Sequence, residues 1–166
     1  MSTRVLLIWP GTDGSAAGNF GCPQLVTMAT YVREKTGAQI DIVDLHAERA
    51  FGPVDLGKIF RGPEGRGYDV VGFSCYSSFD FLKTEAVAQI AREMLPKAVI
   101  CAGGYHTSAR PSDFVYDGVA WTGDANNVLT SWMHAAACFE FELNIATPKD
   151  FGPKPPVVKW AKESGA

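Results

Sequence analysis

Short apolar segments alternate with longer amphipathic segments through most of the chain. The strand-like segments are Arg4–Pro10, Gln39–Leu45, Asp69–Ser74, Ala98–Ala102 and Gly118–Trp121. Apolar residues at helical spacing fill Pro23–Gly37, Phe81–Leu95 and Asn126–Cys138. This alternation predicts an α/β fold, a three-layer doubly wound parallel sheet. Because crossovers are right-handed, we expect five strands in the flavodoxin-like order 2-1-3-4-5.

Two regions depart from this alternation. Residues 47–67 are rich in Gly, Pro and charge, and there we expect only a short helix around Val54–Phe60. After residue 138, one further strand is possible over Phe139–Ile145, and four prolines then break regular structure. We therefore predict a ligand-binding domain over residues 1–138 and a linker or docking tail over residues 139–166. Pro111–Tyr116 is expected to form one helical turn.

Composition excludes several classes of protein. A formal charge of −3 over 166 residues does not indicate a basic surface that would bind nucleic acid. No apolar run approaches the about 20 residues that span a bilayer, so we expect no membrane partner. The four cysteines are widely spaced and form no Cys-x-x-Cys pair, which argues against a metal site. We expect a cytoplasmic protein with reduced thiols and no signal peptide, in which Cys101 is a small buried hydrophobe.

The most informative stretch is Ala98–Pro111. An apolar strand, expected to be buried on both faces, leads directly into Gly103 and Gly104 and then into four polar-capable side chains. In open parallel sheets, ligands bind beyond the carboxyl ends of the strands. The stretch is therefore either a binding loop or a tight turn whose glycines only satisfy backbone geometry.

Four loops leave the expected strands at this same edge: 11–21, 74–78, 103–108 and 122–126. The residues that we expect to line a ligand site are Thr12, Asp13, Gly14, Ser74, Tyr76, Ser77, Ser78, Gly103, Gly104, Tyr105, His106, Gly123 and Asp124. These loops contain no Lys or Arg and no evident hydrolytic triad. They favour a cradle for a large ligand over a hydrolytic site.

The individual polar residues have less specific interpretations. His106 is either a metal ligand or proton carrier, or a residue that only lines the site. Asp124 is expected to be a helix N-cap that can also touch a ligand. His46, at a strand end, is expected to be a solvated loop residue, and His134 to be structural or solvated.

Three segments occur in the order and spacing of a known family. They are Val-Val-Gly-Phe-Ser-Cys-Tyr-Ser-Ser at 70–78, Ala-Gly-Gly-Tyr-His-Thr-Ser-Ala-Arg-Pro at 102–111 and Trp-Thr-Gly-Asp-Ala at 121–125. Over residues 4–138 the chain resembles the cobalamin-binding domain of cobalamin-dependent radical S-adenosylmethionine enzymes. The resemblance implies that Ser74, Tyr76 and Ser78 flank the nucleotide tail of cobalamin, and that the backbone at Gly103 and Gly104 lies close to the cofactor, with Tyr105 and His106 beside it. Gly123 and Asp124 match the Gly-Glu/Asp element of the last loop.

Two departures from the resemblance limit the function. The Asp-x-His-x-x-Gly motif of methyltransferase domains is absent, since residues 11–21 contain Asp13 but no histidine. No histidine of that loop is therefore expected on cobalt, and no metal ligand is assigned. The chain also lacks a Cys-x-x-x-Cys-x-x-Cys motif, so it cannot perform radical chemistry alone.

The resemblance implies a non-catalytic cobalamin-binding module. Its partner would be a radical S-adenosylmethionine subunit or domain that carries an iron–sulfur cluster, and the assembly would transfer a methyl group. One alternative is a sensor or regulator of flavodoxin-like fold that binds cobalamin or another tetrapyrrole. A flavin- or nucleotide-binding α/β protein is the other alternative.

Overall fold

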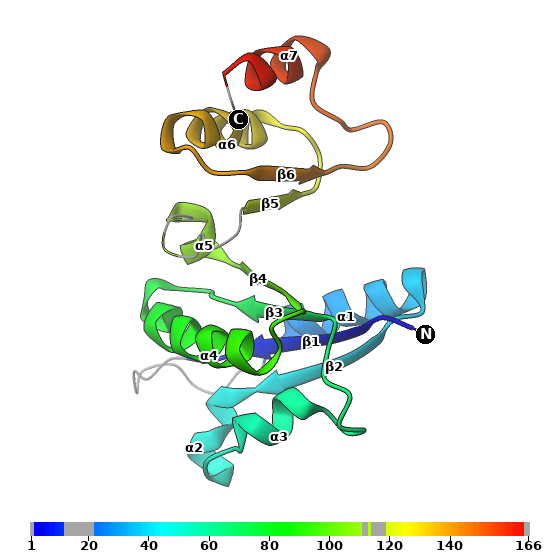
Figure 1. Cartoon of the computed structure of the whole chain (residues 1–166), viewed down its shortest axis with the longest axis vertical. Coiled ribbons are helices and arrows are strands. Elements are labelled where there is room, and N and C mark those ends of the chain that lie inside the picture. Colours follow the sequence, from blue (N-terminus) through cyan, green and yellow to red (C-terminus); the bar gives the residue numbers. More distant parts are fainter. Residues whose placement is uncertain (1, 12–21, 111–112, 114–118, 165–166) are drawn as a thin grey trace. The chain divides into compact units, whose positions relative to one another are not determined.

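The computed structural model describes residues 2–11, 22–110, 113 and 119–164. The chain divides into two compact units, residues 1–110 and 111–166 (Figure 1). The boundary predicted between residues 138 and 139 lies inside the second of these units.

The first unit is built on a four-stranded parallel sheet. Its strands are β1 (Arg4–Trp9), β2 (Gln39–Asp44), β3 (Val70–Ser74) and β4 (Val99–Gly103). They lie in the order β2-β1-β3-β4, and all three pairings are parallel. The predicted parallel α/β fold and the order of these four strands are confirmed.

Helices cover the two faces of this sheet (Figure 1). Helix α1 (Pro23–Thr36) packs through Leu25 and Ala29 on the face that carries Leu7 and Ile40. The opposite face carries Leu6, Ile8, Val71 and Phe73, which pack with α3 (Leu56–Arg61) and α4 (Phe81–Met94). Neighbouring side chains of β1 point to opposite faces, so its apolar run is buried on both sides.

The burial predicted for β4 is wrong. Exposed and partly buried residues alternate along this strand, Val99 is 62% exposed, and Cys101 is exposed rather than buried. The outer edge of β4 pairs with no strand among the described residues. An apolar run cannot distinguish a central strand from an edge strand, which explains the error.

The helix boundaries follow local sequence signals. Helix α1 begins at a proline, whose missing N–H needs no partner there, and ends at Gly37, which has a left-handed φ of 70°. Asp55 caps α3 by accepting a hydrogen bond from the Lys58 N–H. Two short helices that the sequence analysis missed, η1 (Leu45–Ala47) and α2 (Glu48–Phe51), follow β2.

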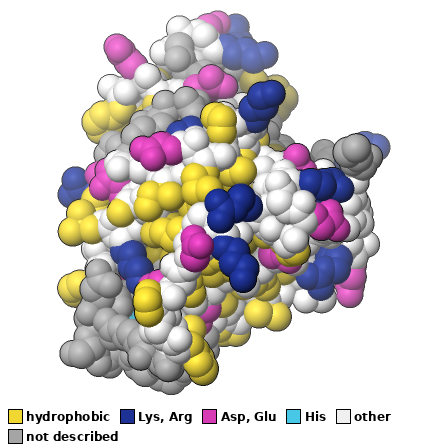
Figure 2. Space-filling model, turned by 60° about the horizontal axis from the view of Figure 1, so that its bottom comes forward, with side chains coloured by type: hydrophobic (Ala, Val, Ile, Leu, Met, Phe, Trp, Pro, Cys, Tyr) yellow, Lys and Arg dark blue, Asp and Glu magenta, His cyan; other side chains and the backbone are white. Residues whose placement is uncertain are grey.

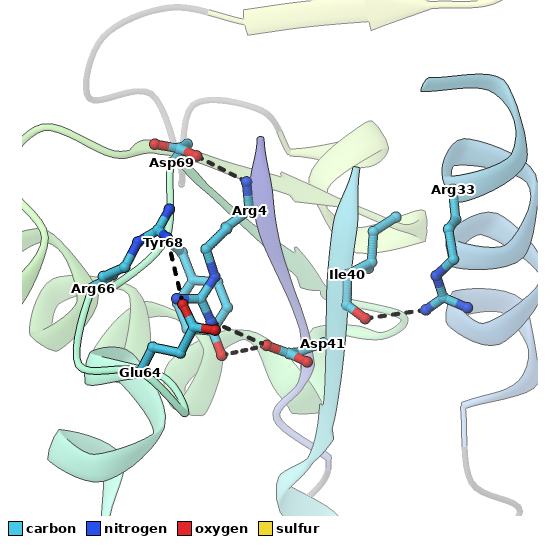
Figure 3. Close-up of polar contacts among 8 residues, drawn as sticks. All are labelled: Arg4, Arg33, Ile40, Asp41, Glu64, Arg66, Tyr68 and Asp69. Atoms are coloured by element: carbon cyan, nitrogen blue, oxygen red, sulfur yellow. Dashed lines mark hydrogen bonds and ion pairs between the residues drawn. The ribbon is translucent and has the colours of Figure 1, made fainter. Parts of the chain in front are cut away.

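A polar network fixes the end of the sheet at which the strands begin (Figure 3). The backbone N–H of Arg4 donates to Asp69 at 2.8 Å, and the Tyr68 hydroxyl donates to Asp41 at 2.8 Å. The Arg4 guanidinium lies 3.8 Å from the same Asp41 carboxylate and 5.0 Å from the centre of the Tyr68 ring. This network connects β1, β2 and the residues before β3, at the opposite end of the sheet from the carboxyl ends of the strands.

The second unit contains β5 (Val119–Thr122), α6 (Asn127–Phe139), β6 (Leu143–Ala146) and α7 (Pro155–Glu163). Strands β5 and β6 form their own two-stranded parallel sheet. The predicted strand at Gly118–Trp121 and the helix after it are confirmed, whereas the five-stranded order is not.

Two details of the second unit correct the predictions from the sequence, and the position of His134 agrees with its prediction. Residues 155–163 form a helix rather than a structureless tail, because prolines at its first positions lack only N–H groups that have no intrahelical partner. Asn126, not Asp124, caps α6: its side chain accepts from the N–H groups of Val128 and Leu129. His134 is exposed, bonds to the Thr130 carbonyl and contacts the Trp160 ring.

Candidate functional site

The loops after β3 and β4 lie together at the carboxyl edge of the first sheet. Ser74 is in register with Gly103, and the Cys75 N–H donates to the Gly103 carbonyl at 2.8 Å. The two strands therefore stay paired up to the point where both chains turn away. This pairing brings the predicted 74–78 and 103–108 segments into one site.

Gly104 allows the two loops to approach closely. Its φ is +116°, a conformation that favours glycine, and a Cβ there would lie 2.2 Å from the Cys75 carbonyl oxygen. Gly103 is different, since a Cβ there would meet no atom of the described residues within 4 Å. Gly104 is thus required by the packing of protein on protein, while Gly103 leaves exposed backbone that a ligand can approach.

Polar groups hold the loop at residues 74–78, called the serine loop below, in place. Ser77 and Asp80 form a reciprocal capping box at η2 (Ser78–Asp80), in which the Ser77 N–H donates to Asp80 at 3.0 Å. Ser78 Oγ lies 2.9 Å from His106 Nδ1, and the His106 ring stacks on Phe81 with centroids 4.8 Å apart. This histidine is buried in α5 (Tyr105–Ala109), a helix that the sequence did not predict. The helical turn predicted at Pro111–Tyr116 lies outside the described residues except for Asp113.

The chemistry of these residues suits binding better than catalysis. Burial raises the pKa of the Cys75 thiol, so it stays protonated and is a poor nucleophile at neutral pH. Within the described ranges, no three His, Cys, Asp or Glu side chains are grouped to hold a metal ion. Among the described residues, the printed contacts of the His106 ring are with Ser78 and Phe81.

Two tyrosines add an aromatic surface to the site. Tyr76 and Tyr105 meet edge to face with ring centroids 5.2 Å apart, and they are 56% and 71% exposed. Phe79 and Leu82, close in sequence to Tyr76, are also exposed. On the face drawn in Figure 2, yellow hydrophobic side chains lie among basic and acidic ones.

The remaining predicted site residues lie outside the described part of the first unit. Thr12, Asp13 and Gly14 lie outside the described residues. Gly123 and Asp124 belong to the second unit, and both are exposed. The structure therefore groups Ser74, Tyr76, Ser77, Ser78, Gly103, Gly104, Tyr105 and His106.

His46 corrects a prediction at the same edge. It is only 5% exposed rather than solvated, and it stacks on Trp9 with ring centroids 5.3 Å apart. A Cβ on Gly11 would lie 2.5 Å from the His46 Cβ, so the glycine makes room for this histidine. The sequence does not predict this stacked pair, because Trp9 has the pattern of a strand residue and a lone histidine carries no spacing signal.

These residues fit a broad, amide-rich cofactor. Gly103 leaves its backbone open, Ser78 and Tyr76 bring hydroxyl groups, and the exposed tyrosine rings offer apolar contact. The fold is that of a Rossmann-like α/β domain, a class in which ligands bind at the carboxyl ends of the parallel strands.

The B12 binding domain family model matches residues 17–130, more than half of the chain. The chain therefore belongs to the B12 binding domain family, and its cofactor is cobalamin.

A second family model matches the carboxyl-terminal part. It is the aspartate/ornithine carbamoyltransferase Asp/Orn binding domain, over residues 118–166. Ornithine carbamoyltransferases from Nitrobacter winogradskyi and Bradyrhizobium diazoefficiens are 58% and 60% identical to this chain over 48 residues, which is 29% of this chain. The chain spans only 16% of the length of either relative.

A solved structure of ornithine carbamoyltransferase from Burkholderia thailandensis aligns over 94% of this chain and 52% of the carbamoyltransferase chain, at 16% identity and a TM-score of 0.40.

Among the described residues, no helix is long and apolar enough to cross a membrane.

Proposed function

We propose that the first unit holds cobalamin at the loops that follow β3 and β4 and presents the corrin to a partner. The observation that carries this proposal is the contrast between the two adjacent glycines. Gly104 is packed against the Cys75 carbonyl, whereas a side chain at Gly103 would project into open space beside the serine loop. A backbone left open at the carboxyl edge of a parallel sheet suits a broad, flat ligand.

The residues around Gly103 have distinct roles in this proposal. Ser74, Ser77 and Ser78 supply hydroxyl groups to the nucleotide portion of the cofactor, and His106 positions Ser78 through their 2.9 Å contact. Tyr76 and Tyr105 pack against the apolar edge of the ligand. When bound, cobalamin supplies a cobalt centre that can carry a methyl group, while the protein supplies position and environment.

We propose that the partner is a radical S-adenosylmethionine subunit or domain with an iron–sulfur cluster, and that the assembly transfers a methyl group. The three sequence segments that resemble such cobalamin domains support this proposal.

We also propose that the complete sheet has five strands in the order 2-1-3-4-5, in which β5 pairs with β4. The unpaired outer edge of β4 and the 15-residue connection from β4 to β5 are compatible with a crossover.

Two variants of β4 test the cobalamin site. Gly103→Val adds a side chain beside the serine loop, and Cys101→Val alters the same strand two residues earlier. Both positions are exposed, and valine is favourable in strands, so both variants should fold. The purified chain and each variant are mixed with hydroxocobalamin at micromolar concentration, passed through a desalting column and examined for the corrin spectrum.

Retention of the corrin by the wild type and Cys101→Val, with at least tenfold weaker binding by Gly103→Val, is the expected result. A wild-type chain that retains no corrin contradicts the proposal. Equal retention by all three proteins would place the cofactor elsewhere.

A second candidate function concerns the second unit. We propose that this unit contributes part of a site for the amino-acid substrate of a carbamoyltransferase, because the Asp/Orn binding domain model matches residues 118–166 and the chain is 58–60% identical to ornithine carbamoyltransferases over 48 residues. Calorimetric titration of the whole chain with ornithine, with aspartate as the comparison, tests this proposal. Saturable heat with ornithine is expected, and its absence at millimolar ligand contradicts the candidate.

A further inference from the structure

Two aromatic rings with unsatisfied nitrogens lie at the carboxyl ends of β1 and β2. Trp9 is the last residue of β1, and His46 follows β2 within η1. Their rings stack at a centroid distance of 5.3 Å and an interplanar angle of 26°. The Asp44 carboxylate accepts the His46 backbone N–H at 2.9 Å, which holds the histidine at the end of its strand.

Among the residues that the structure describes, these ring nitrogens have no partner. Trp9 Nε1 and His46 Nδ1 are both buried and form no hydrogen bond with any of those residues. Leaving a buried donor unsatisfied is costly, and buried polar groups in native proteins are nearly always paired. Two such atoms on stacked neighbours indicate that a hydrogen-bond partner is missing.

The position of this ring pair connects it with the candidate site. Strand β1 lies between β2 and β3, with Trp9 opposite Asp44 and Ile8 opposite Phe73. The pair therefore lies at the same edge of the same sheet as Ser74, one strand farther along. Its nitrogens are at a strand-end position where an open parallel sheet binds ligands.

We infer that Trp9 and His46 form an additional polar contact for cobalamin, an inference that rests on the proposed function. The Trp9 Nε1–H donates to an acceptor oxygen of the cofactor, and His46 Nδ1 donates or accepts according to its tautomer. The acceptor is an amide carbonyl of the corrin periphery or an oxygen of the nucleotide phosphate. Since both nitrogens are buried now, binding includes a local rearrangement that brings this oxygen to them.

The first experiment observes the Trp9 indole proton directly. In ¹H–¹⁵N spectra of the ¹⁵N-labelled whole chain, the four tryptophans give four indole signals, and hydroxocobalamin is diamagnetic. On saturation with hydroxocobalamin, the Trp9 signal should move downfield and exchange more slowly with solvent than before. Trp121, Trp132 and Trp160, in the second unit, serve as internal references.

The second experiment compares Trp9→Phe with Trp132→Phe. Trp9→Phe keeps an aromatic ring against His46 but removes the N–H. Loss of one hydrogen bond should weaken cobalamin binding about tenfold, which is about 1.4 kcal/mol. The cofactor-free stability should stay unchanged or rise, because the variant removes an unsatisfied donor. Trp132→Phe should bind cobalamin as the wild type does.

Dicyanocobinamide, which lacks the phosphate, ribose and base, distinguishes the two acceptors. If Trp9→Phe also weakens cobinamide binding, the acceptor is a corrin amide; if only cobalamin binding weakens, it belongs to the nucleotide portion. A wild-type chain that binds cobalamin with an unmoved Trp9 indole signal, or with equal affinity in Trp9→Phe, overturns this inference and leaves the proposed function intact. A wild-type chain that does not bind cobalamin contradicts both.

Discussion

Replacing Gly104 with alanine should strongly destabilise the first unit. The residue has φ +116° and ψ 178°, a region that is essentially restricted to glycine. The added Cβ would also lie 2.2 Å from the Cys75 oxygen, 2.7 Å from its carbonyl carbon and 3.2 Å from the Tyr76 nitrogen. All three atoms are backbone, so no side chain can turn away to relieve the clash.

The expected loss of stability follows from the backbone strain and from the steric clash. Strain in this backbone region costs of order 1–3 kcal/mol, and overpacking costs a further 1–3 kcal/mol. We expect Gly104→Ala to lower the free energy of unfolding by about 2–6 kcal/mol, a large part of the typical total of about 5–15 kcal/mol. The preceding residue supplies the control: Gly103→Ala meets nothing within 4 Å, and alanine in a strand is favoured over glycine by about 0.5–1 kcal/mol.

Urea unfolding of the whole chain, followed by far-ultraviolet circular dichroism, measures both variants. Hydrogen exchange of the β3 and β4 amides then assigns any loss to the first unit. Gly104→Ala should unfold at lower urea and lose protection in these strands, whereas Gly103→Ala should match the wild type or exceed it slightly. Two variants of equal stability would refute the close approach of the two loops.

Three further predictions concern other contacts of the fold. Burial, with the hydrogen bond to Asp41, raises the pKa of Tyr68 to about 12; because the unfolded phenol loses its proton near pH 10, stability should fall from about pH 10 to 12. Urea unfolding across that range should show a smaller fall for Tyr68→Phe, and an unchanged slope would contradict the raised pKa. Asn126→Ala should lower the free energy of unfolding of the second unit by about 1 kcal/mol while Asp124→Ala has little effect, and the reverse result would restore Asp124 as the helix cap. A thiol reagent should modify exposed Cys138 rapidly and Cys22 and Cys75 slowly, since the latter are buried and burial raises their pKa values; mass mapping of labelled peptides measures this, and rapid labelling of Cys75 would contradict the packing at the end of β3.

Much of the first unit could be predicted because its signals are local. Apolar runs marked β1 and β3, helical spacing marked α1 and α4, and Pro23 and Gly37 marked the ends of one helix. Parallel strands bring their carboxyl ends to one edge of the sheet. The grouping of the serine loop with the loop at residues 103–108 could therefore also be predicted from the sequence.

The wrong predictions concern features that depend on tertiary contacts or on the exact start of a helix. Whether β4 is central or at an edge depends on what pairs with it, and its apolar composition is the same in both cases. The burial of His46 depends on the missing side chain of Gly11 and on the Trp9 ring, which are 35 and 37 residues away in the chain. The choice of Asn126 over Asp124 as a cap depends on where the first turn of α6 begins, within two residues.

The segment around β5 shows how one short motif can serve two family resemblances. Residues 118–130 lie in both family matches, and Gly123 and Asp124 belong to this overlap. A strand followed by a small residue, an acidic residue and a helix is a common solution wherever a parallel strand turns into a helix, because small residues permit the turn and polar side chains cap the helix. In the structure β5 pairs with β6, and the second unit buries its own cluster of Leu129, Met133 and Ala161. The match to the aspartate/ornithine carbamoyltransferase Asp/Orn binding domain, over residues 118–166, runs through this same compact unit. The proposed cobalamin site therefore lies within the first unit, where Gly103, Ser78 and His106 are placed by contacts within residues 1–110.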